Sequence, residues 1–119
     1  VIRFKQTGPL TAEIIREKIL HHTREELPYV AAILLEEFKE EPKRKLTSIT
    51  ATIFVERDSQ KAIVIGKGGL MLKQIGQEAR IELEALLDIK VFLQLWVKVE
   101  RDWREDEAIL REMGYGEAR

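Results

Sequence analysis

The chain contains no cysteine among its 119 residues and only three prolines. Without thiols it forms neither a disulfide framework nor a thiolate zinc site, which suits a reducing compartment such as the cytosol. The sequence also lacks a run of about 18 apolar residues and a signal-like start, so it predicts no membrane-spanning helix. These absences favour a cytoplasmic protein.

Neither sign of charge dominates, because 20 lysines and arginines stand against 21 aspartates and glutamates and the net charge is −1. A nucleic-acid-binding protein usually has a basic footprint, but a local basic groove can form on a neutral protein. Five basic residues surround one glycine-rich segment with few acids between them: Arg57, Lys61, Lys67, Lys73 and Arg80. They predict either such a groove or ordinary solvated side chains.

The length of the chain, of which 45% is hydrophobic, suits one domain with a real core. The chain begins at Val1 instead of Met, and residues 1–8 show no clear period. We therefore expect residues 1–8 to be a linker remnant from a longer protein and residues 9–119 to form the domain.

Hydrophobic periodicity predicts an α+β domain with the element order α-β-β-α-α-β-α. A first helix capped by Thr11 would bury Ile15, Ile19 and Leu27 and end at Pro28. Strands are predicted over 29–37, 46–57 and 90–100, with a charged connection at 40–45 between the first two. The later helices are predicted from Asp58 or Ser59 to Ile65, over 70–87 and over 102–113.

Two of these elements have a clear buried side. The helix over 70–87 places apolar residues at helical spacing: Leu72, Ile75, Ala79, Leu83 and Leu86. The strand over 90–100 alternates strictly, with Val91, Leu93, Leu95, Val97 and Val99 on one side and Phe92, Gln94, Trp96 and Lys98 on the other.

Gly66, Lys67, Gly68 and Gly69 join the short helix to the long one. Three glycines in four positions permit a tight turn without Cβ atoms, so another backbone can approach closely. The free N–H groups and positive dipole end of the following helix favour an anion there, and Lys67 adds a positive charge. The segment predicts a phosphate clamp, although a plain glycine turn would have the same sequence.

Two familiar phosphate loops do not fit this segment. A P-loop requires glycine at position 61 and Ser or Thr after Lys67, where Lys61 and Gly68 stand. A dinucleotide fingerprint requires a third glycine at the position of Met71 and a βαβ context. The G-x-x-G loop of the KH module, which clamps the backbone of about four single-stranded nucleotides, remains.

Several conspicuous polar residues favour structural interpretations. His21 and His22 are adjacent, so on a helix they point about 100° apart and predict no metal site. Glu36 and Glu37 have no partnering histidine, and we expect a solvated acidic face there instead of catalysis.

Trp96 and Trp103 could stack on bases, but a place in the core is the favoured prediction for both. Gly76 inside a helix costs about 1 kcal/mol relative to Ala. It suggests close backbone approach by a neighbouring element or by RNA.

A family resemblance follows from several segments taken together. They are Glu-Arg-Asp-Ser-Gln-Lys-Ala-Ile-Val-Ile-Gly-Lys-Gly-Gly at 56–69, Lys-Gln-Ile-Gly at 73–76, Glu-Ala-Arg at 78–80, Leu-Trp-Val-Lys-Val at 95–99, Asp-Trp-Arg at 102–104 and Leu-Pro-Tyr at 27–29. From about Leu10 onward the chain resembles the C-terminal type II KH domain of the Era family of bacterial GTPases. One departure is Gly68, where a second basic residue is common in this loop.

The resemblance implies a three-stranded mixed sheet with helices packed on one face. It also implies a domain that binds the single-stranded 3′ end of small-subunit ribosomal RNA during assembly of the 30S subunit. The RNA-binding residues would be Gly66, Lys67, Gly68 and Gly69 on the phosphates, Ile63, Val64 and Ile65 as an apolar floor for the bases, and Arg57, Lys61, Lys73 and Arg80 as the source of positive charge.

The GTP-binding motifs of the Era family belong to an N-terminal domain, and no residue here matches them. We therefore expect this fragment to have neither enzymatic activity nor a cofactor, with GTP and magnesium bound by the missing domain. The resemblance further implies contact with that GTPase domain and with the small ribosomal subunit, and peripheral association of the parent protein with the inner membrane face.

Two other hypotheses stay open. The chain could be a protein-interaction or ribosome-docking module whose glycine loop is only structural. It could also be a fragment of a phosphate-binding enzyme, although no acid–base constellation accompanies the loop.

Overall fold

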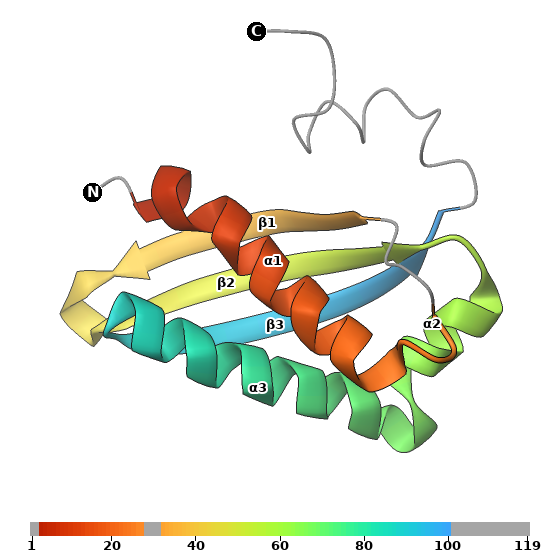
Figure 1. Ribbon diagram of the computed structural model, residues 1–119. Coiled ribbons are helices and arrows are strands. Elements are labelled where there is room, and N and C mark those ends of the chain that lie inside the picture. The colour runs from red at the N-terminus through yellow and green to blue at the C-terminus, as the bar shows by residue number, and fades with distance from the viewer. Residues whose placement is uncertain (1–2, 28–31, 101–119) are drawn as a thin grey trace, which may run out of the picture.

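Three strands form one mixed sheet in the computed structural model, which describes residues 3–27 and 32–100 (Figure 1). β1 (Ala32–Glu41) pairs antiparallel with β2 (Leu46–Val55), and β2 pairs in parallel with β3 (Lys90–Val99). The strand order is β1-β2-β3. The mixed sheet expected from the resemblance is confirmed.

Helices α1 (Arg3–Thr23) and α3 (Leu70–Leu87) lie on the same face of the sheet, and α2 (Asp58–Ile65) follows the end of β2 (Figure 1). The order α-β-β-α-α-β agrees with the prediction. The last predicted helix, over 102–113, lies outside the described residues. No helix within 3–27 or 32–100 is long and apolar enough to cross a membrane.

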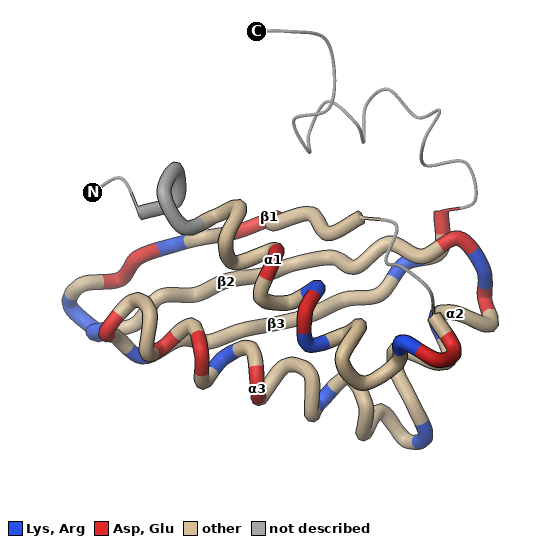
Figure 2. Tube along the Cα trace, viewed as in Figure 1, with Lys and Arg blue, Asp and Glu red and all other residues tan. Residues whose placement is uncertain are grey.

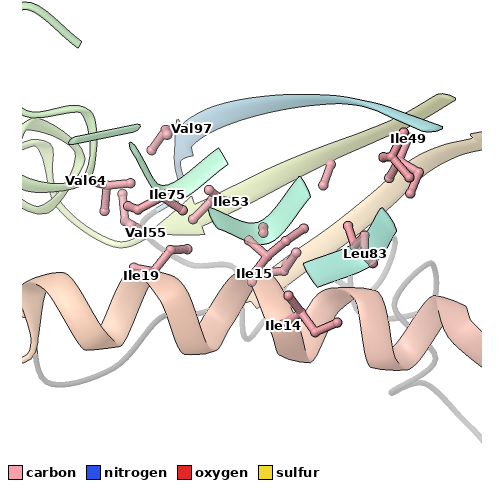
Figure 3. Packing of buried hydrophobic residues seen from close by; sticks show 14 of the residues in the cluster. Ile14, Ile15, Ile19, Ile49, Ile53, Val55, Val64, Ile75, Leu83 and Val97 are labelled. Atoms are coloured by element: carbon pink, nitrogen blue, oxygen red, sulfur yellow. The ribbon is translucent and has the colours of Figure 1, made fainter. Parts of the chain in front are cut away.

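The core lies between the sheet and these helices. The buried side chains come from helical spacing on α1 and α3 and from alternate positions on β2: Ile15, Ile19, Ile75, Ala79, Leu83, Ile49, Ala51 and Ile53. Figure 3 shows Ile15 and Ile19 pointing from α1 toward Ile53 and Ile75. Each large aliphatic side chain buried in this way contributes about 1.5–3 kcal/mol to folding.

The first helix differs from its prediction at both ends. It begins at Arg3 and includes Pro9, so Thr11 is not its N-cap but a buried residue inside it. It ends at Thr23, and Leu27 is buried in the turn that follows, where its N–H donates to the Thr23 carbonyl at 2.7 Å. Residues 3–8, which we expected to be linker, are helical here, and the division of the chain at residue 8 stays a prediction.

The first strand extends to Glu41, beyond its predicted end at residue 37. The end of this strand is held by a polar contact: the Ser48 hydroxyl donates to the Glu41 carboxylate at 3.0 Å across the hairpin. Cross-strand bonds of this kind offset the low β-propensity of Glu and Lys. The predicted connection at 40–45 narrows to a 3₁₀ turn over Pro42–Arg44, followed by Lys45 in the left-handed region (φ 52°).

A β-bulge interrupts the pairing of β1 with β2 between Leu35 and Glu37. Leu35 and Phe38 flank the bulge, and both pack against the core although they are three residues apart. The extra residue, Glu36, therefore shifts the alternation of the strand by one position. This shift explains why the alternation is blurred in the sequence of β1.

The bounds of α3 and β3 agree closely with the prediction, but the burial of two of their side chains, Leu86 and Trp96, does not. Leu86 is 44% exposed and Leu87 is buried in its place, because the buried residues of α3 follow one another at intervals of four from Ile75 to Leu87. The prediction that Trp96 lies in the core is wrong: its side chain is 53% exposed, on the sheet face away from α1 and α3. Trp103 lies outside the described residues.

Truncation of Leu83 tests this arrangement of α3. Leu83→Ala should lower the free energy of unfolding by about 2–5 kcal/mol, because a fully buried side chain leaves a cavity. The matched substitution Leu86→Ala, three residues away and partly exposed, should cost about 1 kcal/mol or less. Urea denaturation followed by circular dichroism measures both values, and equal losses would contradict the observed helix orientation.

Candidate nucleic-acid interface

The glycine segment forms a tight turn between α2 and α3. Gly66, Gly68 and Gly69 all have positive φ, at 76°, 63° and 80°, in which side chains with a Cβ are strained. The turn is closed by backbone bonds, with the Gly66 N–H donating to the Ala62 carbonyl at 2.8 Å and the Gly69 N–H to the Gly66 carbonyl at 3.1 Å. Lys67 is exposed at the tip.

The three positions require glycine for different structural reasons. A Cβ on Gly66 would lie 2.5 Å from the Met71 Cβ and 2.8 Å from the Met71 nitrogen, so the first turn of α3 occupies that space. A Cβ on Gly68 or Gly69 would meet nothing within 4 Å. Gly66 is therefore required by packing within the chain, whereas the outer side of Gly68 and Gly69 is open to a ligand.

A groove begins at the glycine turn and runs between α3 and the edge strand β3. Its described lining is Gly69, Leu72, Lys73, Gly76, Gln77, Arg80, Leu93, Gln94 and Leu95. None of these residues is an aspartate or glutamate. The groove combines an apolar floor, amide groups and two basic side chains, which are the groups that single-stranded RNA recognition uses.

The depth of the groove depends on Gly76. The nearest atom to a Cβ at this position would be the Leu95 Cδ1, at an ordinary contact distance of 3.6 Å. A side chain here would therefore not clash, but it would fill part of the groove. The prediction that the backbone of a neighbouring element approaches Gly76 closely is therefore wrong for the described residues, and approach by RNA stays a prediction.

The basic residues predicted to surround the turn divide into two groups. Lys73 and Arg80 line the groove, and Lys67 lies beside it at the tip of the turn. Arg57 precedes α2, and since α2 has eight residues Arg57 lies about 12 Å from the turn. Neither Arg57 nor Lys61 belongs to the described lining of the groove.

The apolar floor differs from its prediction. Val64 is fully buried in the core, so its side chain does not form part of the surface to which we assigned it. Ile63 and Ile65 are partly exposed on α2. The apolar residues that line the groove are Leu72, Leu93 and Leu95, which sequence reasoning placed only on buried faces.

The start of α2 also corrects a prediction. Neither Asp58 nor Ser59 caps this helix, which begins after Arg57. The Gln60 Oε1 accepts from the Glu56 and Arg57 N–H groups at 2.9 and 3.1 Å and so fixes the entry of the chain into α2.

One carboxylate ties α3 to the start of β3 beside the groove. The Glu84 Oε2 accepts from the Val91 N–H and from the Arg80 Nη1, both at 3.0 Å. The Val91 N–H, followed by Arg80, lowers the pKa of Glu84. Arg80 thus enters the groove with its orientation fixed, whereas Lys67 and Lys73 have no ion-pair partner among the described residues.

A second set of polar contacts joins α1 to α3. His22 Nε2 lies 2.9 Å from the Glu78 Oε1, and Lys18 Nζ lies 2.7 Å from the Glu82 Oε1. His22 is therefore engaged in helix packing. Within the described part of the chain no three His, Cys, Asp or Glu side chains gather as metal ligands would.

The comparison with known proteins agrees with this geometry. The family model described as KH domain matches residues 26–104, which is well over half of the chain. The chain belongs to the KH domain family.

The KH domain has close curated relatives. It is 58% identical over 106 residues to GTPase Era of Geobacter metallireducens and 55% identical over 108 residues to GTPase Era of Heliobacterium modesticaldum. These alignments cover 89% and 91% of this chain but only 36% of either relative. The chain thus spans about a third of the length of the curated relatives it matches, and the resemblance to an Era KH domain is confirmed.

Two solved structures have the same fold. One is Era of Aquifex aeolicus, as a point variant bound to GDP and aluminium fluoride, with a TM-score of 0.78. The other is Era in complex with MgGDPNP and nucleotides 1506–1542 of 16S ribosomal RNA, with a TM-score of 0.79. Each is 44% identical to this KH domain and aligns with 90% of it and 36% of the solved chain.

Alanine substitutions test whether Gly66 is required by packing and whether Gly68 lies against open space. Gly66→Ala should lower the free energy of unfolding by about 3 kcal/mol or more, because the new Cβ meets the Met71 backbone and φ is positive. Gly68→Ala is strained only by the positive φ and should lower the free energy of unfolding by about 1–2 kcal/mol. Urea denaturation of both variants measures the difference, and equal losses would mean that Met71 moves aside without cost.

Acid titration tests the Glu84 bridge. In the folded protein the pKa of Glu84 is lower than its ordinary value of 4.5. The bridge therefore stabilises the fold fully at pH above 4.5, and this stabilisation is lost as the pH falls through the folded-state pKa. Glu84→Gln keeps an acceptor for Val91 but does not titrate. Its urea midpoint should therefore fall less than that of the parent between about pH 5 and about pH 3. Glu25→Gln, in the exposed turn after α1, is the control.

Proposed function

We propose that this KH domain binds single-stranded RNA in the groove between α3 and β3, with the phosphates at the glycine turn. The observation that carries the proposal is the continuity of an acid-free groove with a turn whose outer glycines are open. Lys67 and Lys73 are available to phosphates, and Leu72 and Leu95 offer an apolar surface to bases.

The RNA that we propose is the 3′ end of small-subunit ribosomal RNA, bound during assembly of the small subunit. One structural neighbour, Era, has been crystallised with nucleotides 1506–1542 of 16S ribosomal RNA. Its KH-like part shares 44% of its aligned residues with this chain, which supports the same class of RNA.

The remaining proposals concern the longer protein of which we infer this domain is part. Because the curated relatives are GTPases and this chain covers about a third of them, we propose that GTP and magnesium bind elsewhere in that protein. A cytoplasmic location, contact with the small ribosomal subunit and peripheral association with the inner membrane face complete the proposal.

RNA titration tests the proposed function. Labelled single-stranded RNA from the 3′ end of 16S ribosomal RNA should bind, and the complementary strand, once annealed, should abolish binding, since the groove needs splayed bases. With two or three phosphates contacted, affinity should fall about 7- to 18-fold between about 50 mM and about 200 mM salt. Equal affinity for the duplex would point to nonspecific electrostatic binding.

A double substitution in the turn tests its contact with phosphate. Replacing Lys67 and Gly68 together by aspartate places two carboxylates at the open side of the turn and should weaken RNA binding several-fold or more. The matched control, Lys43→Asp with Lys45→Asn, makes the same change in net charge in the exposed β1–β2 turn. Fluorescence anisotropy compares the two. Equal affinity of the turn variant and the parent would exclude the turn as the contact.

A further inference from the structure

The outer face of the sheet, turned away from α1 and α3, carries three different rows of side chains. β3 contributes the exposed aromatic residues Phe92 and Trp96, which are 54% and 53% exposed. β2 contributes hydroxyls at alternate positions, Thr50 and Thr52 among them. β1 contributes carboxylates, and Figure 2 shows acidic residues along this strand.

The β-bulge gathers the carboxylates. In a regular strand, neighbouring residues point to opposite faces, but Glu36 accepts from the Thr52 hydroxyl and Glu37 from the Thr50 hydroxyl at 3.5 Å. Both glutamates therefore lie on the outer face. Both are exposed, and neither has an ion-pair partner among the described residues.

The carboxylates and the indole share one line across the sheet. Thr52 is the register partner of Trp96 on β3 and the hydrogen-bond donor to Glu36 on β1. Adjacent strands are about 4.8 Å apart, so the backbones that carry Trp96 and the two glutamates are about 10 Å apart, but the Glu36 carboxylate reaches Thr52, one strand away from Trp96. An arginine or lysine side chain can reach across that distance, with its charge at the carboxylates or over the ring.

This chemistry favours a cation over RNA. Exposed aromatic residues on a sheet can stack on bases, but two uncompensated carboxylates beside the indole repel phosphates. The remaining charges on this face are Lys39 and Glu41 at the hairpin end of β1, where Glu41 pairs with Arg44, and Lys90 and Lys98 near the two ends of β3. An arginine guanidinium satisfies both groups, because it pairs with carboxylates and stacks on indole.

We propose that the outer face centred on Glu36, Glu37 and Trp96 is a docking surface for an arginine-containing segment of a basic partner protein. The surface adjoins the α3–β3 groove at Gln94, but Glu36, Glu37 and Trp96 are not among the residues that line the groove. Tryptophan on one partner and arginine on the other are frequent among the residues that carry most of the binding energy at protein interfaces. The proposal does not depend on the RNA-binding function.

Titration with a synthetic arginine–glycine peptide tests the surface, with the same peptide carrying glutamine for arginine as the control probe. In the ¹⁵N-labelled chain the arginine peptide should shift the Trp96 indole signal and the backbone amides around Glu36. The glutamine peptide should not. Shifts confined to the α3–β3 groove or to α1 would overturn the proposal.

Matched variants identify the groups that bind. Trp96→Ala and the pair Glu36→Gln with Glu37→Gln should each weaken peptide binding about fivefold or more. The controls are Ile81→Ala, another exposed apolar residue, and Glu25→Gln with Glu26→Gln, another exposed pair of glutamates. If the control variants weaken peptide binding equally, the effect comes from general charge or hydrophobicity, and the proposal is overturned.

Other occupants of this face give other results. RNA that shifts the Trp96 indole would make it a nucleic-acid surface, and self-association lost in Trp96→Ala would make it an interface between copies of this chain. Contacts between Trp96 and residues 101–119 in nuclear Overhauser spectra would make the chain its own occupant. Each of these overturns the proposal. RNA affinity should be unchanged in all these variants, whereas the Lys67 and Gly68 double variant should keep peptide binding.

Discussion

The parallel pairing of β2 with β3 is the constraint on which the rest of this domain depends. Parallel neighbours cannot be joined by a tight hairpin, so the chain must return to the start of the sheet through a crossover. Here the crossover is α2, the glycine turn and α3. Because α3 must run back along the sheet to reach Lys90, the turn is held at the far end, and the groove follows from α3 lying beside an edge strand.

The same constraint shows why the glycine turn is both structural and functional. Gly66 is fixed by contact with Met71, and that contact sets how α3 leaves the turn. Gly68 and Gly69 then face outward without any neighbour within reach of a Cβ. A structural interpretation of the loop and a phosphate-binding one are therefore compatible, since they concern different glycines.

Much of the fold could be predicted from the sequence because periodic segments dominate it. The bounds of α3 and the alternation of β3 follow from spacing alone, and the glycine run marks the turn. The failures have physical causes. Pro9 lies within α1, and polar cross-strand bonds lengthen β1. The N-cap of α2 is Arg57 instead of Asp58 or Ser59, and the Gln60 side chain accepts from its N–H. The groove lining could not be predicted, because partly buried leucines on α3 and β3 have the same spacing as core residues. Only the mid-helix Gly76 signalled that a helix face was open.

The β-bulge at Glu36 also has a consequence for sequence comparison. The two halves of β1 face the core in opposite phase, so each half alternates normally but the whole strand does not. A relative that lacks the bulge would need one residue fewer between Leu35 and Phe38 to keep both apolar sets inside. A single-residue gap at this point of an alignment would therefore mark the loss of a local distortion and, with it, the loss of one of the two adjacent carboxylates from the outer face.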